Sequence, residues 1–186
     1  MAERVCPWWV GYLLVSPVRR WFEKPEEVLD AQVRSGATAL DVGCGMGYFS
    51  LPLAERVGPG GRVICVDLQE RMIRSLRRRA ARAGVSDRIE PRVCGASSLG
   101  IRDLEGRIDF ALAFAVVHEV PDAERFLAEI GSALAPGGRL LVAEPKGHVS
   151  AEALEETLAA ARKAGLSVIE RPRIRGSRTA LLERAR

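Results

Sequence analysis

Three glycines alternate with other residues in the segment from Asp41 to Tyr48, at Gly43, Gly45 and Gly47. Glycine has no Cβ, so it permits positive φ angles and lets the backbone approach a ligand closely. Glycine clusters also form tight turns that bind nothing. Asp67 lies roughly 20 residues beyond the loop, the spacing from which an acidic side chain accepts hydrogen bonds from ribose hydroxyls. Together the two features favour a ligand that contains adenosine.

The form of the loop distinguishes among adenosine ligands. A dinucleotide site uses the spacing G-x-G-x-x-G and places a pyrophosphate at a helix N-terminus. This loop has the spacing G-x-G-x-G, and Asp41 precedes its first glycine. A carboxylate at that position would repel a diphosphate and attract a ligand that bears an ammonium group. The sequence therefore favours a cationic adenosine ligand.

A second candidate for chemistry is the pair His118 and Glu119, which follows the apolar segment Ile108 to Phe114. Histidine suits proton abstraction near neutral pH, so these are the candidate catalytic residues if the reaction needs a base. The alternative is an ordinary polar start to a helix.

Three further polar residues follow the apolar segment Leu140 to Ala143. We interpret Glu144 and Lys146 as an ion pair in an exposed loop, and His148 as another exposed loop residue. The alternative is a role at the mouth of the predicted pocket, which lies near these residues.

These residues must be held by a framework of strands and helices. Apolar segments bounded by glycine, proline or polar residues predict strands at residues 38–42, 62–67, 89–94, 108–114 and 140–143. Helical spacing predicts helices at residues 25–33, 48–57, 71–83, 123–134 and 151–164, with Gly84 and Gly165 as two of the stops and a turn at Pro136-Gly137-Gly138. Alternating strands and helices predict a parallel sheet covered on both faces, with right-handed crossovers.

The C-terminal part has a different pattern. Segments 166–170 and 179–182 are short and apolar, with Gly176 between them, and predict a hairpin or an antiparallel edge. At 186 residues the chain suits one compact domain, which we place at residues 25–186. Residues 1–24 are a separate aromatic cap or lid segment in this interpretation.

The charge balance argues against a dedicated nucleic-acid-binding protein. The chain has 28 basic and 24 acidic residues, a net charge of +4, and 47% hydrophobic residues. This is a mild excess, spread along a composition typical of a globular chain. The densest basic run has helical spacing, so a solvated helix face is the simpler explanation, with a nucleic-acid stripe as the alternative. That run comprises Arg71, Arg74, Arg77, Arg78, Arg79 and Arg82.

Cysteine and histidine positions indicate neither a disulfide framework nor a metal site. Cys44, Cys65 and Cys94 fall in or beside strand-like segments, where reduced, mostly buried thiols are expected. No CxxC pair occurs, and the two histidines lie far apart in sequence, so no metal is expected. The apolar run from Val5 to Val18 is too short to span a bilayer and lacks the form of a secretory signal. We therefore expect a cytoplasmic protein.

Four segments in order resemble the class I S-adenosylmethionine-dependent methyltransferases. Leu40 to Gly47 is similar to the first motif of that family, and Val66-Asp67 to the acidic end of its second strand. The segment Asp109 to Asp122 resembles its fourth strand and following loop, and Leu134 to Leu140 the turn before strand five. The resemblance covers residues 26 to 184. It implies a Rossmann-like, doubly wound, three-layer α/β/α fold whose seven-stranded sheet is mostly parallel with an antiparallel C-terminal strand.

The resemblance also implies a set of cofactor-binding residues. The three loop glycines would line the methionine moiety, Asp67 would hold the ribose, Leu68 would pack on the adenine, and Phe114 would contact the cofactor through its backbone. The full set implied for S-adenosylmethionine is Asp41, Gly43, Cys44, Gly45, Gly47, Asp67, Leu68, Gly95, Ala96 and Phe114.

One position departs from the family pattern. Many relatives have an acidic residue after the third strand, where it binds the adenine amino group, but this chain has Gly95 there. Adenine recognition would then rely on backbone groups of Gly95 and Ala96, or on Ser97.

Methyl transfer from a sulfonium is an in-line displacement, in which positioning and desolvation supply much of the acceleration. We expect a small-molecule methyl acceptor, with an apolar character, in preference to nucleic acid. The alternative is an S-adenosylmethionine-binding protein without transfer activity that docks a partner through its N-terminus; an RNA methyltransferase is less favoured.

The N-terminus is the most unusual part of the composition. Trp8, Trp9 and Trp21 are all of the chain's tryptophans. Such a cluster could form a lid over an apolar substrate, a homodimer contact, ordinary packing on the sheet, or peripheral contact with a membrane surface.

Overall fold

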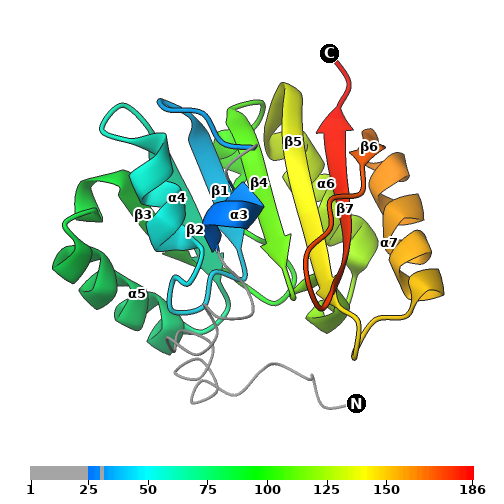
Figure 1. Ribbon diagram of the computed structural model, residues 1–186, viewed down its shortest axis with the longest axis horizontal. Coiled ribbons are helices and arrows are strands. Elements are labelled where there is room, and N and C mark those ends of the chain that lie inside the picture. The colour runs from blue at the N-terminus through cyan, green and yellow to red at the C-terminus, as the bar shows by residue number, and fades with distance from the viewer. Residues whose placement is uncertain (1–24, 30–31) are drawn as a thin grey trace. The chain divides into compact units, whose positions relative to one another are not determined.

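A computed structural model describes residues 25–29 and 32–186 (Figure 1). The aromatic segment 1–24, with its possible lid, dimer and membrane roles, lies outside the described residues. The helices are α3 (Pro25–Leu29), α4 (Ser50–Val57), α5 (Glu70–Ala83), α6 (Ala123–Ala133) and α7 (Ala151–Lys163), with short 3₁₀ turns η1 (Ser86–Arg88), η2 (Arg102–Leu104) and η3 (Val117–Glu119). The strands are β1 (Thr38–Val42), β2 (Arg62–Asp67), β3 (Ile89–Val93), β4 (Ile108–Phe114), β5 (Leu134–Pro145), β6 (Leu166–Glu170) and β7 (Ser177–Arg184).

The strands form a seven-stranded sheet in the order β3-β2-β1-β4-β5-β7-β6. β7 pairs antiparallel with both β5 and β6, whereas the recorded pairs among β1 to β5 are parallel. This confirms the predicted Rossmann-like fold with an antiparallel C-terminal strand. The described part of the chain has no helix long and apolar enough to cross a membrane.

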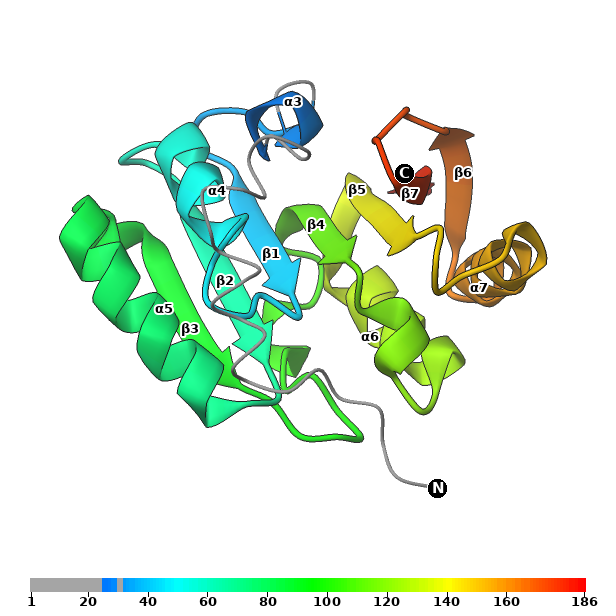
Figure 2. The same ribbon diagram turned by 60° about the horizontal axis from the view of Figure 1, so that its bottom comes forward.

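The chain divides into two compact units, one ending at Cys94 and the other running from Gly95 to Arg186. In the first unit, β1 pairs with β2 and β2 pairs with β3, so that Asp41 lies opposite Cys65 and Asp67 opposite Val93. Helix α4 packs on β1 and β2, and α5 on β2 and β3 (Figure 2). The apolar face of α5, including Ile73 and Leu76, is fully buried. The first unit thus holds the glycine loop on a packed core of its own.

The second unit contains β4 to β7 with α6 and α7. Strands β4 and β5 pair in parallel, but the register shifts between Ile108 and Phe110, which lie opposite Leu134 and Arg139. The expected Pro136-Gly137-Gly138 turn is therefore an irregularity inside a longer strand. Glycine is needed at Gly138 because a Cβ there would lie 2.7 Å from the carbonyl oxygen of Ile108. Helix α7 packs on α6 and β6, as Figure 2 also shows.

The predicted and observed elements differ mainly at their ends. Helix α4 begins at Ser50, two residues later than expected, because the chain up to Gly47 still carries the positive φ angles of the loop. Helix α5 ends at Gly84 as predicted: Gly84 has φ +69° and its N–H bonds back to Ala80 and Ala81.

Candidate functional site

Asp41 lies in β1, immediately before the glycine loop, and its side chain is buried with 3% exposed. Its Oδ2 accepts a hydrogen bond from Ser50 Oγ at 2.5 Å, at the first residue of α4. Burial disfavours the charged carboxylate and raises its pKa to about 7, against the opposing effect of the Ser50 hydrogen bond; the nearby charge of Asp67 raises it further. Asp41 is therefore poised between its two protonation states near neutral pH, and a nearby cation would ionise it.

Asp67 ends β2 and fixes the loop from the other side. Its Oδ2 accepts the N–H of Gly45 at 2.8 Å, and its Oδ1 accepts the N–H of Gln69 at 2.8 Å. Burial raises the pKa of this carboxyl, while the two backbone hydrogen bonds lower it. An ionised carboxylate has about four acceptor sites, so Asp67 retains capacity for ribose hydroxyls.

The loop backbone is tied to the strand that carries Asp67. The N–H groups of Gly43 and Cys44 both donate to the carbonyl of Val66, at 2.8 and 3.1 Å. The Arg79 guanidinium, on α5, donates to the carbonyl of Met46. The loop is thus held in shape by its own unit before any ligand binds.

The loop glycines serve different purposes. Gly43, Gly45 and Gly47 all have positive φ, at 71°, 54° and 84°. A Cβ on Gly45 would meet no atom of the described structure within 4 Å, so this position faces open space. A Cβ on Gly47 would overlap the side chains of Leu51 and Leu76. Gly45 therefore offers room for a ligand, whereas Gly47 is required by packing against the helices.

Apolar side chains are exposed at the ends of β2 and β3. Leu68 is 38% exposed and Val93 is 50% exposed, two of the three large hydrophobic residues exposed in the described chain. Val93 lies opposite Asp67 in the register of β2 and β3. Packing of Leu68 on adenine stays a prediction, and Val93 exposes a second apolar side chain on the neighbouring strand.

Gly95 and Ala96, which are predicted to contact adenine, open the second unit in an exposed turn. The N–H of Gly95 donates to the carbonyl of Ser98 at 3.0 Å. Glu129 of α6 holds the turn by accepting from Ser98 Oγ and from the N–H of Leu99, at 3.1 and 2.8 Å. The Gly95 N–H is therefore already used within its own turn.

Glu144, near the end of β5, is a buried carboxylate of the second unit with three hydrogen-bond partners. Its side chain is 1% exposed. Oε1 accepts the N–H groups of Val116 and Val117 at 3.2 and 2.8 Å, and Oε2 bonds to Nδ1 of His118. The interpretation of Glu144 as half of an exposed ion pair with Lys146 is therefore wrong, because the loop after β4 folds back onto it.

His118 lies in η3, and its Nδ1 atom is hydrogen-bonded to Glu144. That hydrogen bond raises the pKa of His118, burial lowers it, and the charges of Glu144 and Glu119 raise it further. Nε2 lies 3.5 Å from Nδ1 of His148, and the two rings meet edge to face. His148 is thus an exposed loop residue, as expected, but one that contacts His118.

The turn that brings His118 to Glu144 begins directly after β4. Phe114, which ends the strand, is buried, and the N–H of Ala115 donates to the carbonyl of Ala143 at 2.7 Å. Ala115 has φ +55°, which makes it the one non-glycine residue with positive φ in the described chain. A positive φ strains a residue that has a Cβ, so it persists only where the surrounding structure holds the backbone in place. Such strained residues often occur at functional sites. The resulting arrangement of His118 and Glu144 can hold and transfer a proton.

Comparison with known proteins agrees with these features. A methyltransferase domain family matches residues 33–174. Nocamycin O-methyltransferase of Saccharothrix syringae is 36% identical over 118 residues, covering 60% of this chain and 39% of that protein. Ubiquinone/menaquinone biosynthesis C-methyltransferase of Hydrogenovibrio crunogenus is 31% identical over 112 residues, covering 60% of this chain and 43% of that protein. The chain spans between about a third and a half of the length of the curated relatives it matches.

The fold has close counterparts among solved structures. A SAM dependent methyltransferase from Aquifex aeolicus matches with a TM-score of 0.84 at 22% identity, covering 96% of this chain and 98% of that one. The matched family extends over most of the chain, from before β1 to the segment between β6 and β7. The chain therefore belongs to the methyltransferase domain family, as the motifs in its sequence imply.

Proposed function

We propose that the protein is an S-adenosylmethionine-dependent methyltransferase that acts on a small acceptor by in-line transfer. The observation that carries this proposal is the buried Asp41 carboxyl, whose pKa of about 7 leaves it ready to ionise beside a cationic ligand. The binding of an ammonium group there is favourable because a buried charge is stabilised mainly by an opposite charge.

The residues of the first unit fit S-adenosylmethionine. Gly45 faces open space where a side chain would otherwise lie, so a ligand can approach the backbone. Asp67 has acceptor capacity for the ribose hydroxyls, and Leu68 exposes apolar surface next to it in the chain. We propose that Asp41, Gly43, Cys44 and Gly45 surround the methionine end. Gly47 shapes the same loop by packing.

The cofactor supplies an electrophilic methyl group on a sulfonium when bound. The protein holds the acceptor and, for an O–H acceptor, removes its proton. We assign that proton to Nε2 of His118, because Nδ1 is bonded to Glu144. Glu144 is a positioning residue: it orients the imidazole and stabilises the imidazolium that forms.

The class of acceptor rests on the relatives. One is named as an O-methyltransferase and the other as a C-methyltransferase, both of small molecules. We infer a small molecule with a ring or chain of apolar character, and keep oxygen and carbon as the candidate acceptor atoms.

Calorimetry with S-adenosylmethionine tests the cofactor, and turnover with a panel of phenols, quinols and carboxylic acids tests the reaction. Binding that is lost in Asp67→Ala together with turnover of one acceptor class would support the proposal. Absence of binding would overturn it. Binding without turnover across the panel would favour the alternative, a cofactor-binding protein without transfer activity.

A further inference from the structure

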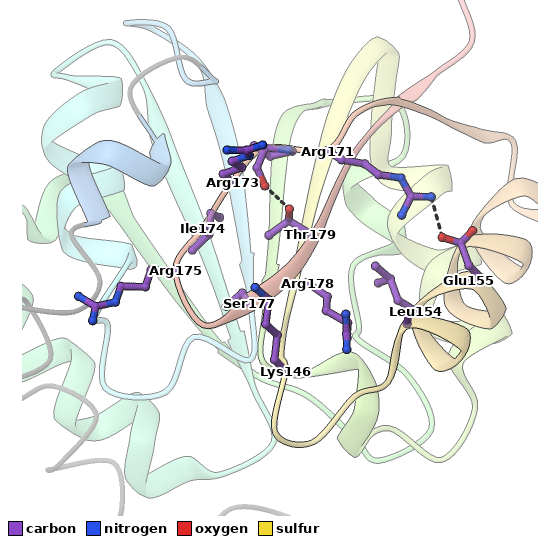
Figure 3. A pocket seen from close by; sticks show the side chains of 12 residues that line it. Lys146, Leu154, Glu155, Arg171, Arg173, Ile174, Arg175, Ser177, Arg178 and Thr179 are labelled. Carbon is purple, nitrogen blue, oxygen red and sulfur yellow. Dashed lines mark hydrogen bonds and ion pairs between the residues drawn. The ribbon is translucent and has the colours of Figure 1, made fainter.

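A groove of about 610 Å³ lies beside the connection between β6 and β7, in the second unit (Figure 3). Among the described residues, its lining has five cationic side chains and one carboxylate, that of Glu155. The cationic residues are Lys146, Arg171, Arg173, Arg175 and Arg178. Neither the methyl-transfer residues nor the cofactor loop account for this concentration of positive charge.

The backbone that carries these arginines is fixed by several hydrogen bonds. Thr179 Oγ1 donates to the carbonyl of Pro172, as Figure 3 shows, and the N–H of Ser177 donates to the carbonyl of Ile174 at 3.1 Å. The N–H of Lys146 donates to the carbonyl of Gly176 at 2.9 Å. The groove is therefore organised before it meets a ligand, which lowers the entropic cost of binding.

Only some of the positive charges in the groove are paired with a carboxylate or a carbonyl group. Arg171 forms an ion pair with Glu155 at 2.7 Å, and Nε of Arg178 donates to the carbonyl of Val149 at 2.9 Å. The structure records no side-chain partner for Lys146 or Arg173 among residues 25–29 and 32–186. Several guanidinium donors and an ammonium thus remain available to an anion. Guanidinium groups match phosphate oxygens in a two-pronged geometry.

The size and composition of the wall narrow the choice of anion. The cavity falls within the range of small-molecule pockets, roughly 300 to 1,000 Å³. Leu154 of α7, Pro172 and Ile174 give it apolar surface, and none of the described residues that line it is aromatic. Single-stranded nucleic acid is usually bound by stacking of its bases on aromatic rings. A compact phosphate on an aliphatic body fits this lining better than a nucleic-acid strand.

We propose that this groove binds a small phosphate or diphosphate ester with an aliphatic part. The phosphate contacts cationic side chains of the groove, and the aliphatic part packs on its apolar lining residues, such as Leu154. Two residues of the groove lie close to Glu144, the partner of His118. Lys146 follows Glu144 by two positions in the sequence, and Arg178 lies opposite Glu144 in the β5–β7 register. The proposal does not depend on methyl transfer.

The test measures binding of inorganic pyrophosphate and of octyl phosphate to the full-length protein by calorimetry. The double variant Lys146→Gln/Arg173→Gln removes two groove cations. The control Arg102→Gln/Arg162→Gln removes two exposed charges from the same unit outside the groove. We expect the groove variant to weaken both ligands at least about tenfold and the control to change them by less than about twofold.

Octyl phosphate should also bind at least about tenfold more tightly than inorganic phosphate, which is measured as a further probe, because the apolar lining contributes. Equal weakening by the two double variants, or no binding of either probe at millimolar concentration, would overturn the proposal. Tighter binding of a single-stranded RNA oligonucleotide, with a steep dependence on salt, would overturn it in favour of a nucleic-acid surface. Affinity for S-adenosylmethionine, measured in parallel, should stay unchanged in the groove variant, which separates this test from that of the proposed reaction.

Discussion

Asp41 and Glu144 are both buried carboxylates near the ends of strands, yet their surroundings differ. Glu144 accepts two backbone N–H groups and bonds to His118, which can carry a positive charge. Asp41 accepts one hydroxyl hydrogen, from Ser50, and the described residues place no cation against it. Glu144 is thus satisfied by its own chain, whereas we propose that a bound ligand completes the surroundings of Asp41.

We propose that the difference reflects two roles: Glu144 positions His118, and Asp41 binds the cofactor. Two N–H bonds and an imidazole offset the cost of burying Glu144, so it can remain in place through a reaction and orient His118. Asp41 bears a burial cost that appears as its raised pKa, a pattern common at functional sites. The following experiments alter one region at a time.

The largest effect of any substitution is expected on cofactor affinity, from Asp67→Ala. The change removes the anchor of the Gly45 N–H and the acceptor for ribose, so affinity for S-adenosylmethionine should fall at least about 100-fold, or roughly 3 kcal/mol. Asp67→Asn keeps one acceptor oxygen and should cost about tenfold. Glu55→Ala, an exposed acidic residue of the same unit, is the control for calorimetry. Equal affinity in Asp67→Ala and Glu55→Ala would contradict the assignment.

A pair of glycine substitutions separates ligand space from packing within the same loop. Gly47→Ala should destabilise the protein by about 2 kcal/mol, since the new Cβ overlaps Leu51 and Leu76 at a positive φ. Gly45→Ala should cost only about 1 kcal/mol of stability but weaken cofactor binding more strongly than its stability loss explains. Denaturant unfolding and calorimetry on both variants check this order. A stable Gly47→Ala protein would contradict the packing role.

At the second carboxylate, Glu144→Ala should lower the free energy of unfolding by about 2 kcal/mol, because the buried N–H of Val117 and the partly buried N–H of Val116 lose their acceptor. Glu144→Gln keeps an acceptor oxygen but removes the charge that raises the pKa of His118. That pKa should therefore fall, as measured by NMR titration of the imidazole. Glu156→Gln, which changes an exposed residue of α7, is the control.

The raised pKa of His118 in the wild type determines how the stability of the protein changes with pH. In the wild type, the stabilisation from protonated His118 is fully present below the unfolded pKa and is lost as pH rises through the higher folded value. Glu144→Gln should flatten this part of the stability profile. An unchanged His118 pKa in the variant would mean that Glu144 does not act on the imidazole.

Asp41→Asn should have a smaller and opposite effect on stability. Because the folded-state pKa of Asp41 is raised to about 7 from 3.8, its contribution favours folding at low pH and is lost as pH rises through about 7. Removing the ionisable group should stabilise the unliganded protein near pH 8 by at least about 1 kcal/mol and leave it nearly unchanged near pH 3, below the unfolded-state pKa, where the carboxyl is protonated in both states. Thermal unfolding at the two pH values measures this. Destabilisation at the higher pH would contradict the account.

Much of the first unit could be predicted from sequence, because its signals are local. The glycine spacing marked the loop, and β1 and β2 have the predicted bounds. Ser50 was missed as the partner of Asp41, because nothing in a run of helix-compatible residues shows that one hydroxyl reaches back nine positions to the strand.

The second unit was harder to predict because its key contact is distant in sequence. Glu144 and His118 are 26 residues apart, and an acid after an apolar run looks like the start of an exposed loop. Only the fold of the chain after β4, with positive φ at Ala115, brings the two together. The arginine groove was missed for a similar reason: the basic residues between β6 and β7 form a concave surface only with Lys146 and α7.

The most direct test of the central claim is the affinity for S-adenosylmethionine as a function of pH, in the wild type and in Asp41→Asn. Wild-type affinity should rise about tenfold per unit of pH below about 7 and level off above it, with a proton released on binding. The variant retains the titration of the ligand itself, so the difference between the two profiles reports Asp41. The account predicts a weaker affinity without this rise in the variant. Identical profiles for the two proteins would contradict it.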